Sequence, residues 1–275
     1  MIVVPLDRLD MSENLRTSLG SLARSLRTDL TLVHVLPDPF AVSYRPSESA
    51  VLTHADRVTE QLEKLAAQLQ DDGIPAHAVV REGVVQAEVV AQAKRSHAEL
   101  IVLPTHRSRA HPWIRRDGGG EHADLLDHSP VPILIIQENT AALTELHKIL
   151  VPLDGSPSGD SILPDVAKLA VSADACVVLV HVLDSHERAP AQAVRQHLSE
   201  RVAELRRAGC STVSDVVRGS DIGRAIIQRA EAMQADLIAM ASQPRESLAG
   251  LSLGRVVESV RRSASVPLLL KNPRF

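Results

Sequence analysis

An internal repeat constrains the fold of this chain more than any single motif does. Short segments of the first half recur in the same order in the second half. The matching pairs are 5–7 with 152–154, 33–36 with 180–183, 79–81 with 216–218, 98–101 with 235–238, and 131–134 with 266–269. The displacement is 147 residues for the first two pairs, 137 for the next two and 135 for the last. This shared order indicates two successive copies of one structural unit, the first with ten additional residues after its second match.

Each half alternates apolar runs with helical spacing, which predicts the element order βαβαβαβαβ. In the second half the pattern predicts strands near 148–153, 175–183, 212–218, 235–241 and 266–270, and helices near 157–171, 190–208, 221–233 and 254–264. Hydrophobic residues make up 44% of the chain but aromatic residues only 1%, so Val, Leu, Ile and Ala must form the cores. Such residues suit buried parallel strands covered by helices. We therefore expect two α/β domains, at 1–137 and 147–275, joined by a linker at 138–146.

Charge and hydropathy exclude several classes of protein. A net charge of −4 gives no electrostatic reason to expect nucleic acid as a partner. The chain shows no leader pattern at Met1 and no run of 18 apolar residues, so we expect a cytoplasmic protein without membrane contact. Cys176 and Cys210 have no neighbours at metal-ligand spacing, and both are expected to be reduced thiols.

The segment from Lys148 to Ala170 predicts a strand, a turn and a helix. Ser156 suits the N-cap of the helix, and Pro157 suits its first position because the missing N–H would have no helical partner. Asp154 then lies at the carboxyl end of a buried strand, which is the edge where open α/β sheets bind ligands. A carboxylate there could meet a polar ligand group, or it could cap the following helix.

The turn Pro152-Leu153-Asp154-Gly155-Ser156 resembles the end of the first strand in universal stress protein domains, and Pro5-Leu6-Asp7 is a weaker copy. The resemblance covers both halves and identifies the chain as a tandem member of this family. It implies two doubly wound, five-stranded parallel sheets with strand order 3-2-1-4-5. It also implies an internal pseudo-dimer in which the last strands, 131–136 and 266–270, pair with each other.

Nucleotide-binding members of the family hold phosphates with Gly-x-x-Gly, a spacer, and then Gly-Ser or Gly-Thr. The matching positions here are Ala241, Pro244, Gly254 and Arg255 in the second half, and Pro104, Arg107, Gly118–Gly120 and Glu121 in the first. Pro244 cannot donate a backbone N–H, and Glu121 would repel a phosphate. The resemblance therefore implies a degenerate phosphate site, with weak or lost nucleotide binding.

The adenine and ribose end of the family site is better kept in the second half. The residues implied by the resemblance are Pro152, Leu153, Asp154, Gly155, Val182, Met240, Ala241, Gly254, Arg255 and Val256. If a nucleotide binds, we expect it in the second half, because Asp7-Arg8-Leu9 replaces the small residues of the turn with bulk.

A loop rich in histidine and arginine distinguishes the first half. Its arginines could bind an anion or could form a solvated basic loop, and its histidines could bind a metal only if three or more donors converged. These residues are His106, Arg107, Arg109, His111, Arg115, Arg116, His122, Asp124 and His128. Trp113 in this loop either packs locally or covers the crevice of the first half, and His34 and His181 are expected to be core histidines with satisfied hydrogen bonds.

No catalytic motif is present: the sequence lacks GxSxG, HExxH, Walker A and GxGxxG patterns. We therefore expect a non-catalytic stress-response or regulatory protein with no assigned metal. The alternative is an adenine-nucleotide sensor that binds ATP or AMP in its second half, and slow ATP hydrolysis is a third, less favoured option. Expected partners are an adenine nucleotide, an unidentified protein and a second copy of the chain.

Overall fold

The computed structural model describes residues 1–36, 48–105, 124–137, 140–183, 191–242 and 254–275. The chain divides into two compact units, Met1–Glu138 and Asn139–Phe275. In the described parts of the chain, no helix is both long and apolar enough to span a membrane.

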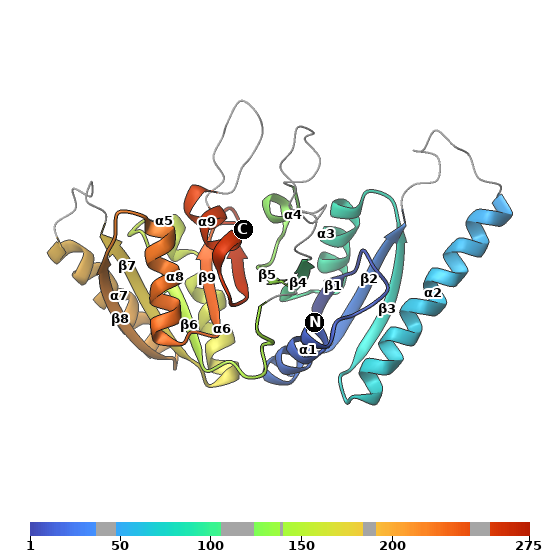
Figure 1. The fold of residues 1–275 in the computed structure, drawn as a ribbon, viewed down its shortest axis with the longest axis horizontal. Helices are drawn as coiled ribbons and strands as arrows, with labels where there is room; N and C mark the ends of the chain where they lie inside the picture. Colours follow the sequence, from blue (N-terminus) through green and yellow to red (C-terminus); the bar gives the residue numbers. More distant parts are fainter. Residues whose placement is uncertain (37–47, 106–123, 138–139, 184–190, 243–253) are drawn as a thin grey trace, which may run out of the picture. The chain divides into compact units, whose positions relative to one another are not determined.

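The first unit follows the predicted order βαβαβαβαβ (Figure 1). Its elements are β1 (Ile2–Pro5), α1 (Glu13–Leu26), β2 (Leu30–Leu36), α2 (Glu48–Asp71), β3 (Ala76–Glu82), α3 (Val85–Arg95), β4 (Leu100–Thr105), α4 (Asp124–His128) and β5 (Ile133–Gln137). The strands pair in parallel in the order β3-β2-β1-β4-β5.

The second unit repeats this arrangement. Its elements are β6 (Lys148–Pro152), α5 (Pro157–Asp160), α6 (Leu163–Ala173), β7 (Cys176–Leu183), α7 (Ala191–Arg207), β8 (Ser211–Arg218), α8 (Ile222–Met233), β9 (Leu237–Ala241), α9 (Arg255–Ser263) and β10 (Leu268–Lys271). The parallel order β8-β7-β6-β9-β10 confirms the expected 3-2-1-4-5 order in this half as well. The pairing of the last strands of the two halves stays a prediction.

The central residues of the middle strands are aliphatic and buried, as the composition requires. Ile2, Val3 and Val4 of β1 and Ile149, Leu150 and Val151 of β6 are each 0% exposed. The two predicted core histidines lie on the second strand of each unit. His34 Nδ1 lies 2.8 Å from the carbonyl oxygen of Leu6, and His181 is buried.

One predicted helix, 157–171, is wrong, because the structure divides it into α5 and α6. Pro164 lies in the first turn of α6 and has no N–H to continue the hydrogen bonding of α5. Ser161 N instead bonds the carbonyl oxygen of Ser158 at 3.3 Å, and α6 begins anew at Leu163. The break leaves α5 as an isolated helix of four residues directly after the turn that carries Asp154.

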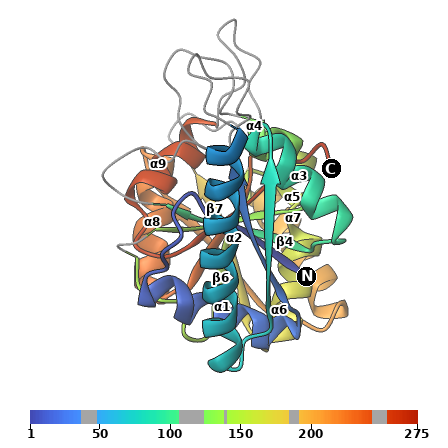
Figure 2. The same ribbon diagram turned by 90° about the vertical axis from the view of Figure 1, so that its right-hand side faces the viewer.

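The additional residues of the first half partly lengthen one helix. The helix α2 has 24 residues, whereas its counterpart α7 has 17. It runs beside β3, as Figures 1 and 2 both show.

Candidate functional site

The turn after β6 presents an exposed carboxylate at the carboxyl edge of the second sheet. Leu153, directly after β6, is 3% exposed, and its N–H donates to the carbonyl oxygen of Val180 at 2.8 Å. Asp154 follows and is exposed, and Gly155 adopts a positive φ of 81° that favours glycine. The chain thus turns sharply out of the sheet and places Asp154 at the edge where ligands of such folds bind.

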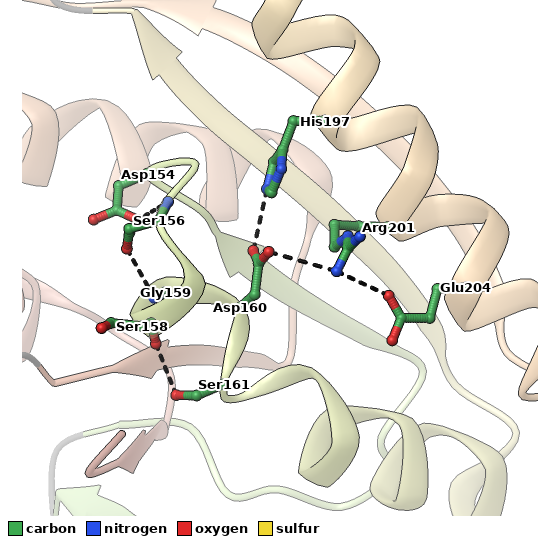
Figure 3. A network of polar contacts seen from close by, with 9 residues as sticks. All are labelled: Asp154, Ser156, Ser158, Gly159, Asp160, Ser161, His197, Arg201 and Glu204. Atoms are coloured by element: carbon green, nitrogen blue, oxygen red, sulfur yellow. Dashed lines mark hydrogen bonds and ion pairs between the residues drawn. The ribbon is translucent and has the colours of Figure 1, made fainter. Parts of the chain in front are cut away.

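Ser156 caps the next helix, and Asp154 holds Ser156 (Figure 3). The hydroxyl of Ser156 accepts a bond from Gly159 N at 2.9 Å, which confirms the predicted N-cap, and Pro157 occupies the first turn as expected. Asp154 Oδ1 accepts bonds from Ser156 Oγ at 2.6 Å and from Ser156 N at 2.9 Å. The capping role therefore falls to Ser156, and Asp154 supports the cap from outside the helix.

The other residues implied by the resemblance lie around the same edge. Pro152 ends β6, Val182 lies near the end of β7 with 8% exposure, and Met240 and Ala241 end β9, with Met240 6% exposed. Because β6 pairs with both β7 and β9, their carboxyl ends are neighbours. Buried apolar groups and one exposed carboxylate thus share the edge.

The first turn of α9 contains three more of the residues implied by the resemblance. Gly254 is the N-cap, and because it has no side chain it cannot cap the first N–H groups of the helix. Arg255 and Val256 follow, and Arg255 is exposed. The first N–H groups of a helix carry about half a positive charge in total, so an anion is stabilised there. This turn follows the strand β9, whose neighbour β6 leads to Asp154.

Glu258 binds the arginines at the other end of α9. Burial acts to raise the pKa of this carboxyl, but hydrogen bonds and charges from Arg261 and Arg262 outweigh it and hold the pKa below its ordinary value. The bonds measure 2.8 Å to Arg261 and 2.8 Å to Arg262. Glu258 therefore holds these two cations on the last turn, while Arg255 lies at the first.

The corresponding edge of the first unit contains a pocket. It is lined by the turn after β1, the start of α1 and the ends of β4 and β5, namely by Leu6, Asp7, Arg8, Asp10, Ser12, Asn14, Leu15, Pro104, Ile136 and Gln137. Arg8 pairs with Asp10 at 2.9 Å, so the guanidinium in this pocket is already bound by a carboxylate of the same turn.

Metal ligands are not gathered in the described parts of the chain, where no group of three or more His, Cys, Asp or Glu side chains could hold an ion. Cys176 and Cys210 are free thiols, and burial raises the pKa of Cys210. Several predicted positions lie outside the described residues: His106, Arg107, Arg109, His111, Trp113, Arg115, Arg116, Gly118–Gly120, Glu121, His122 and Pro244.

The residues that join α5, directly after the Asp154 turn, to α7 were not identified from the sequence. Asp160 at the end of α5 contacts His197 and Arg201 of α7. A signal was available in the charged face of α7, but its partner could not be known without the break between α5 and α6.

Comparison with known proteins gives one family and a set of similar folds. The model of the universal stress protein family matches residues 1–137 and again 145–270. A solved universal stress protein from Archaeoglobus fulgidus DSM 4304 is 18% identical, covers 99% of this chain with 98% of its own, and superposes with a TM-score of 0.75. A functionally unknown protein from Pseudomonas aeruginosa PAO1 is 17% identical over 99% of this chain and 92% of its own, with a TM-score of 0.61. No curated protein matches the chain.

Proposed function

This chain belongs to the universal stress protein family, and on that premise we propose that it is a non-catalytic regulatory protein of the stress response whose second half weakly binds an adenine nucleotide. The observation that carries this function is the exposed Asp154, held by Ser156 at the carboxyl edge of β6. The first half is a structural partner that has lost the ligand turn.

Asp154 suits the nucleoside end of the ligand. A carboxylate accepts about four hydrogen bonds, so binding Ser156 does not by itself exclude further donors such as a ribose hydroxyl or an adenine N–H. The buried side chains of Val182 and Met240 offer an apolar surface on the neighbouring strands. An aromatic base combined with a few polar groups fits such a mixed surface.

The phosphate end favours a small ligand. The N-terminus of α9 and the exposed Arg255 attract an anion, but Pro244 removes one backbone donor from the family motif. One lost charge-assisted hydrogen bond weakens binding by about 1.5–3 kcal/mol, or about tenfold to a hundredfold. A monophosphate, which depends least on a phosphate cradle, is therefore the expected ligand.

The pocket of the first unit is the competing location. Asp7 and Asp10 both line it, and only Arg8 among its lining residues is cationic. Arg8 already pairs with Asp10, so an anionic nucleotide would compete with that carboxylate for the cation. Asp7 and Asp154 occupy equivalent places in the repeat, so substituting each in turn distinguishes the two halves.

Calorimetric titration of the full chain with AMP tests the function. We expect Asp154→Ala to weaken AMP binding at least about tenfold, because it removes the charged acceptor of the nucleoside. Asp7→Ala is the matched control and should change the Kd less than about twofold. ATP should bind no more tightly than AMP and should not be hydrolysed.

Other results would change the assignment. Loss of binding in Asp7→Ala alone would place the nucleotide in the first half, and equal losses would contradict a single site. If the wild-type chain bound neither AMP nor ATP, nucleotide binding by the second half would be refuted, and the regulatory role would not depend on a nucleotide.

A further inference from the structure

The turn that carries Asp154 is anchored to α7 by one carboxylate. Asp160, the last residue of α5, has a side chain that is 15% exposed. Its Oδ1 lies 3.1 Å from His197 Nε2, a distance at which a protonated Nε2 donates, and its Oδ2 lies 3.7 Å from Arg201 Nη1. The helix α7 thus places two donors, on His197 and Arg201, toward the end of α5 (Figure 3). Arg201 Nη1 also lies 3.1 Å from Glu204 Oε2 of the same helix.

A continuous set of bonds runs from Asp160 to Asp154. The N–H of Asp160 donates to the carbonyl oxygen of Ser156 at 3.1 Å and closes the single turn of α5. The hydroxyl of Ser156 accepts the bond from Gly159 N, and both the hydroxyl and the N–H of Ser156 donate to Asp154 Oδ1. Displacement of Asp160 would therefore open the turn that holds the Asp154 carboxylate.

The helix α5 needs such an anchor because it is very short. It has four residues, and none of them is buried. A single helical turn is unstable alone, since fixing its backbone costs more than its few hydrogen bonds return. The helix α5 contacts β9, and the Asp160 side chain adds a polar contact to the 17-residue α7.

The first half lacks this anchor, although it repeats the fold. Glu13 stands at the position of Asp160, but it begins the 14-residue helix α1 instead of ending a short one. At the displacement of 137 residues, His197 and Arg201 correspond to Glu60 and Lys64, which pair with each other at 2.7 Å on an exposed face. Within the described residues, the anchor thus occurs in the half that also keeps the Asp154-Gly155-Ser156 turn.

We propose that Asp160 is a positioning residue for the nucleotide site, through which α7 fixes the Asp154 turn and thereby sets nucleotide affinity. This role rests on the proposed function of the second half. Asp160 need not contact the ligand; it acts through Ser156 and Asp154.

The test uses the full chain and two readouts. Hydrogen exchange of the Gly159 amide, followed by NMR without ligand, reports whether the turn is closed, and calorimetry with AMP reports affinity. We expect Asp160→Ala to accelerate exchange at Gly159 about tenfold and to weaken AMP binding about tenfold. His197→Gln, which keeps a side-chain N–H donor, should retain both properties better than His197→Ala.

Asp215→Ala is the matched control. Asp215 pairs with Arg229 at 2.7 Å in the same unit, on β8, so the substitution removes a comparable ion pair away from the turn. It should leave both Gly159 exchange and AMP affinity unchanged even if it lowers the stability of the unit. An equal effect of Asp160→Ala and Asp215→Ala would reduce Asp160 to a general stabilising role.

The two readouts separate the two ideas. Unchanged exchange at Gly159 in Asp160→Ala would overturn the positioning role whatever the ligand does, and so would accelerated exchange with unchanged AMP affinity. A wild-type chain that binds no AMP would refute the proposed function and, with it, the effect of Asp160 on affinity. The exchange measurement would still decide whether Asp160 holds the Asp154 turn.

Discussion

Gly159 shows how closely the residues of the Asp154 turn are packed. A Cβ atom at this position would lie 2.5 Å from Asp154 Oδ1 and 3.3 Å from Ser156 Oγ. The Asp154 side chain cannot move away freely, because Oδ1 already binds the N–H and the hydroxyl of Ser156. Gly159 is thus required by the position of Asp154, not by its own backbone conformation.

A double-mutant cycle measures this crowding. In the wild-type background we expect Gly159→Ala to destabilise the second unit by about 1–2 kcal/mol, because the methyl group displaces the Asp154 carboxylate. In an Asp154→Ala background the same change should be nearly neutral, giving a coupling energy of about 1 kcal/mol or more. Native-state hydrogen exchange of the second unit provides the free energies. An identical loss in both backgrounds would show that Asp154 is not the obstacle.

The residues of the candidate site could be predicted only in part. The Ser156 cap and the Pro157 position follow from local preferences, and the sequence reveals both. The bond from His197 to Asp160 joins residues 37 apart and depends on where α7 lies over the turn. The sequence shows that α7 has a charged face but not which residue that face contacts, so only the three-dimensional structure identifies Asp160 as the partner.

At the scale of elements, the close contact between α8 and α9 depends on a glycine of α8. A Cβ atom on Gly223, in the first turn of α8, would lie 2.5 Å from Ser259 Oγ and 2.8 Å from Ser259 Cβ. The second distance involves an atom that moves only with the α9 backbone. The position of α9, and with it the position of Arg255, therefore depends on the absence of a side chain at residue 223.

Gly223→Ala tests the close contact of these helices. Alanine improves helix propensity by about 1 kcal/mol, yet we expect a net loss of about 1–3 kcal/mol because α9 must move. Ser259→Gly in the same chain should recover part of the loss. Gly20→Ala in α1 is the control: its Cβ would meet the flexible end of Ile74 at 2.8 Å, which can rotate away. Thermal unfolding compares the variants, and an equal loss at both glycines would contradict a rigid contact.

The order and the type of the elements could be predicted almost completely, because apolar runs and helical spacing repeat in both halves. The observed β7, Cys176–Leu183, differs from the predicted 175–183 by one residue. The helix 157–171 failed because its apolar spacing continues across Pro164, whereas the backbone hydrogen bonding does not. Periodicity reports which face is buried and is insensitive to a break of two residues.

At the scale of the whole molecule, each unit has its own core. Leu32 of β2 and Leu179 of β7 occupy equivalent places in the repeat, and both are 0% exposed. Each lies on a strand that pairs on both sides within its own unit. The two leucines therefore offer a matched pair for asking whether the units unfold independently.

We expect Leu32→Ala and Leu179→Ala each to cost about 2–5 kcal/mol, through the lost burial and the cavity left behind. Hydrogen exchange followed by mass spectrometry should show reduced protection in the first unit for Leu32→Ala and in the second for Leu179→Ala. Loss of protection across the entire chain in either variant would mean that the two units unfold as one.

The Asp160 anchor, present after β6 and without a counterpart at Glu13, bears on how such a chain diverges over generations. When two identical subunits each form a site, one gene encodes both, and every inherited change appears twice. Here each half has its own codons, so a change at Asp160 or Asp154 leaves Glu13 and Asp7 untouched. The two turns of one chain can therefore differ in sequence, which the two turns of a dimer of identical subunits cannot.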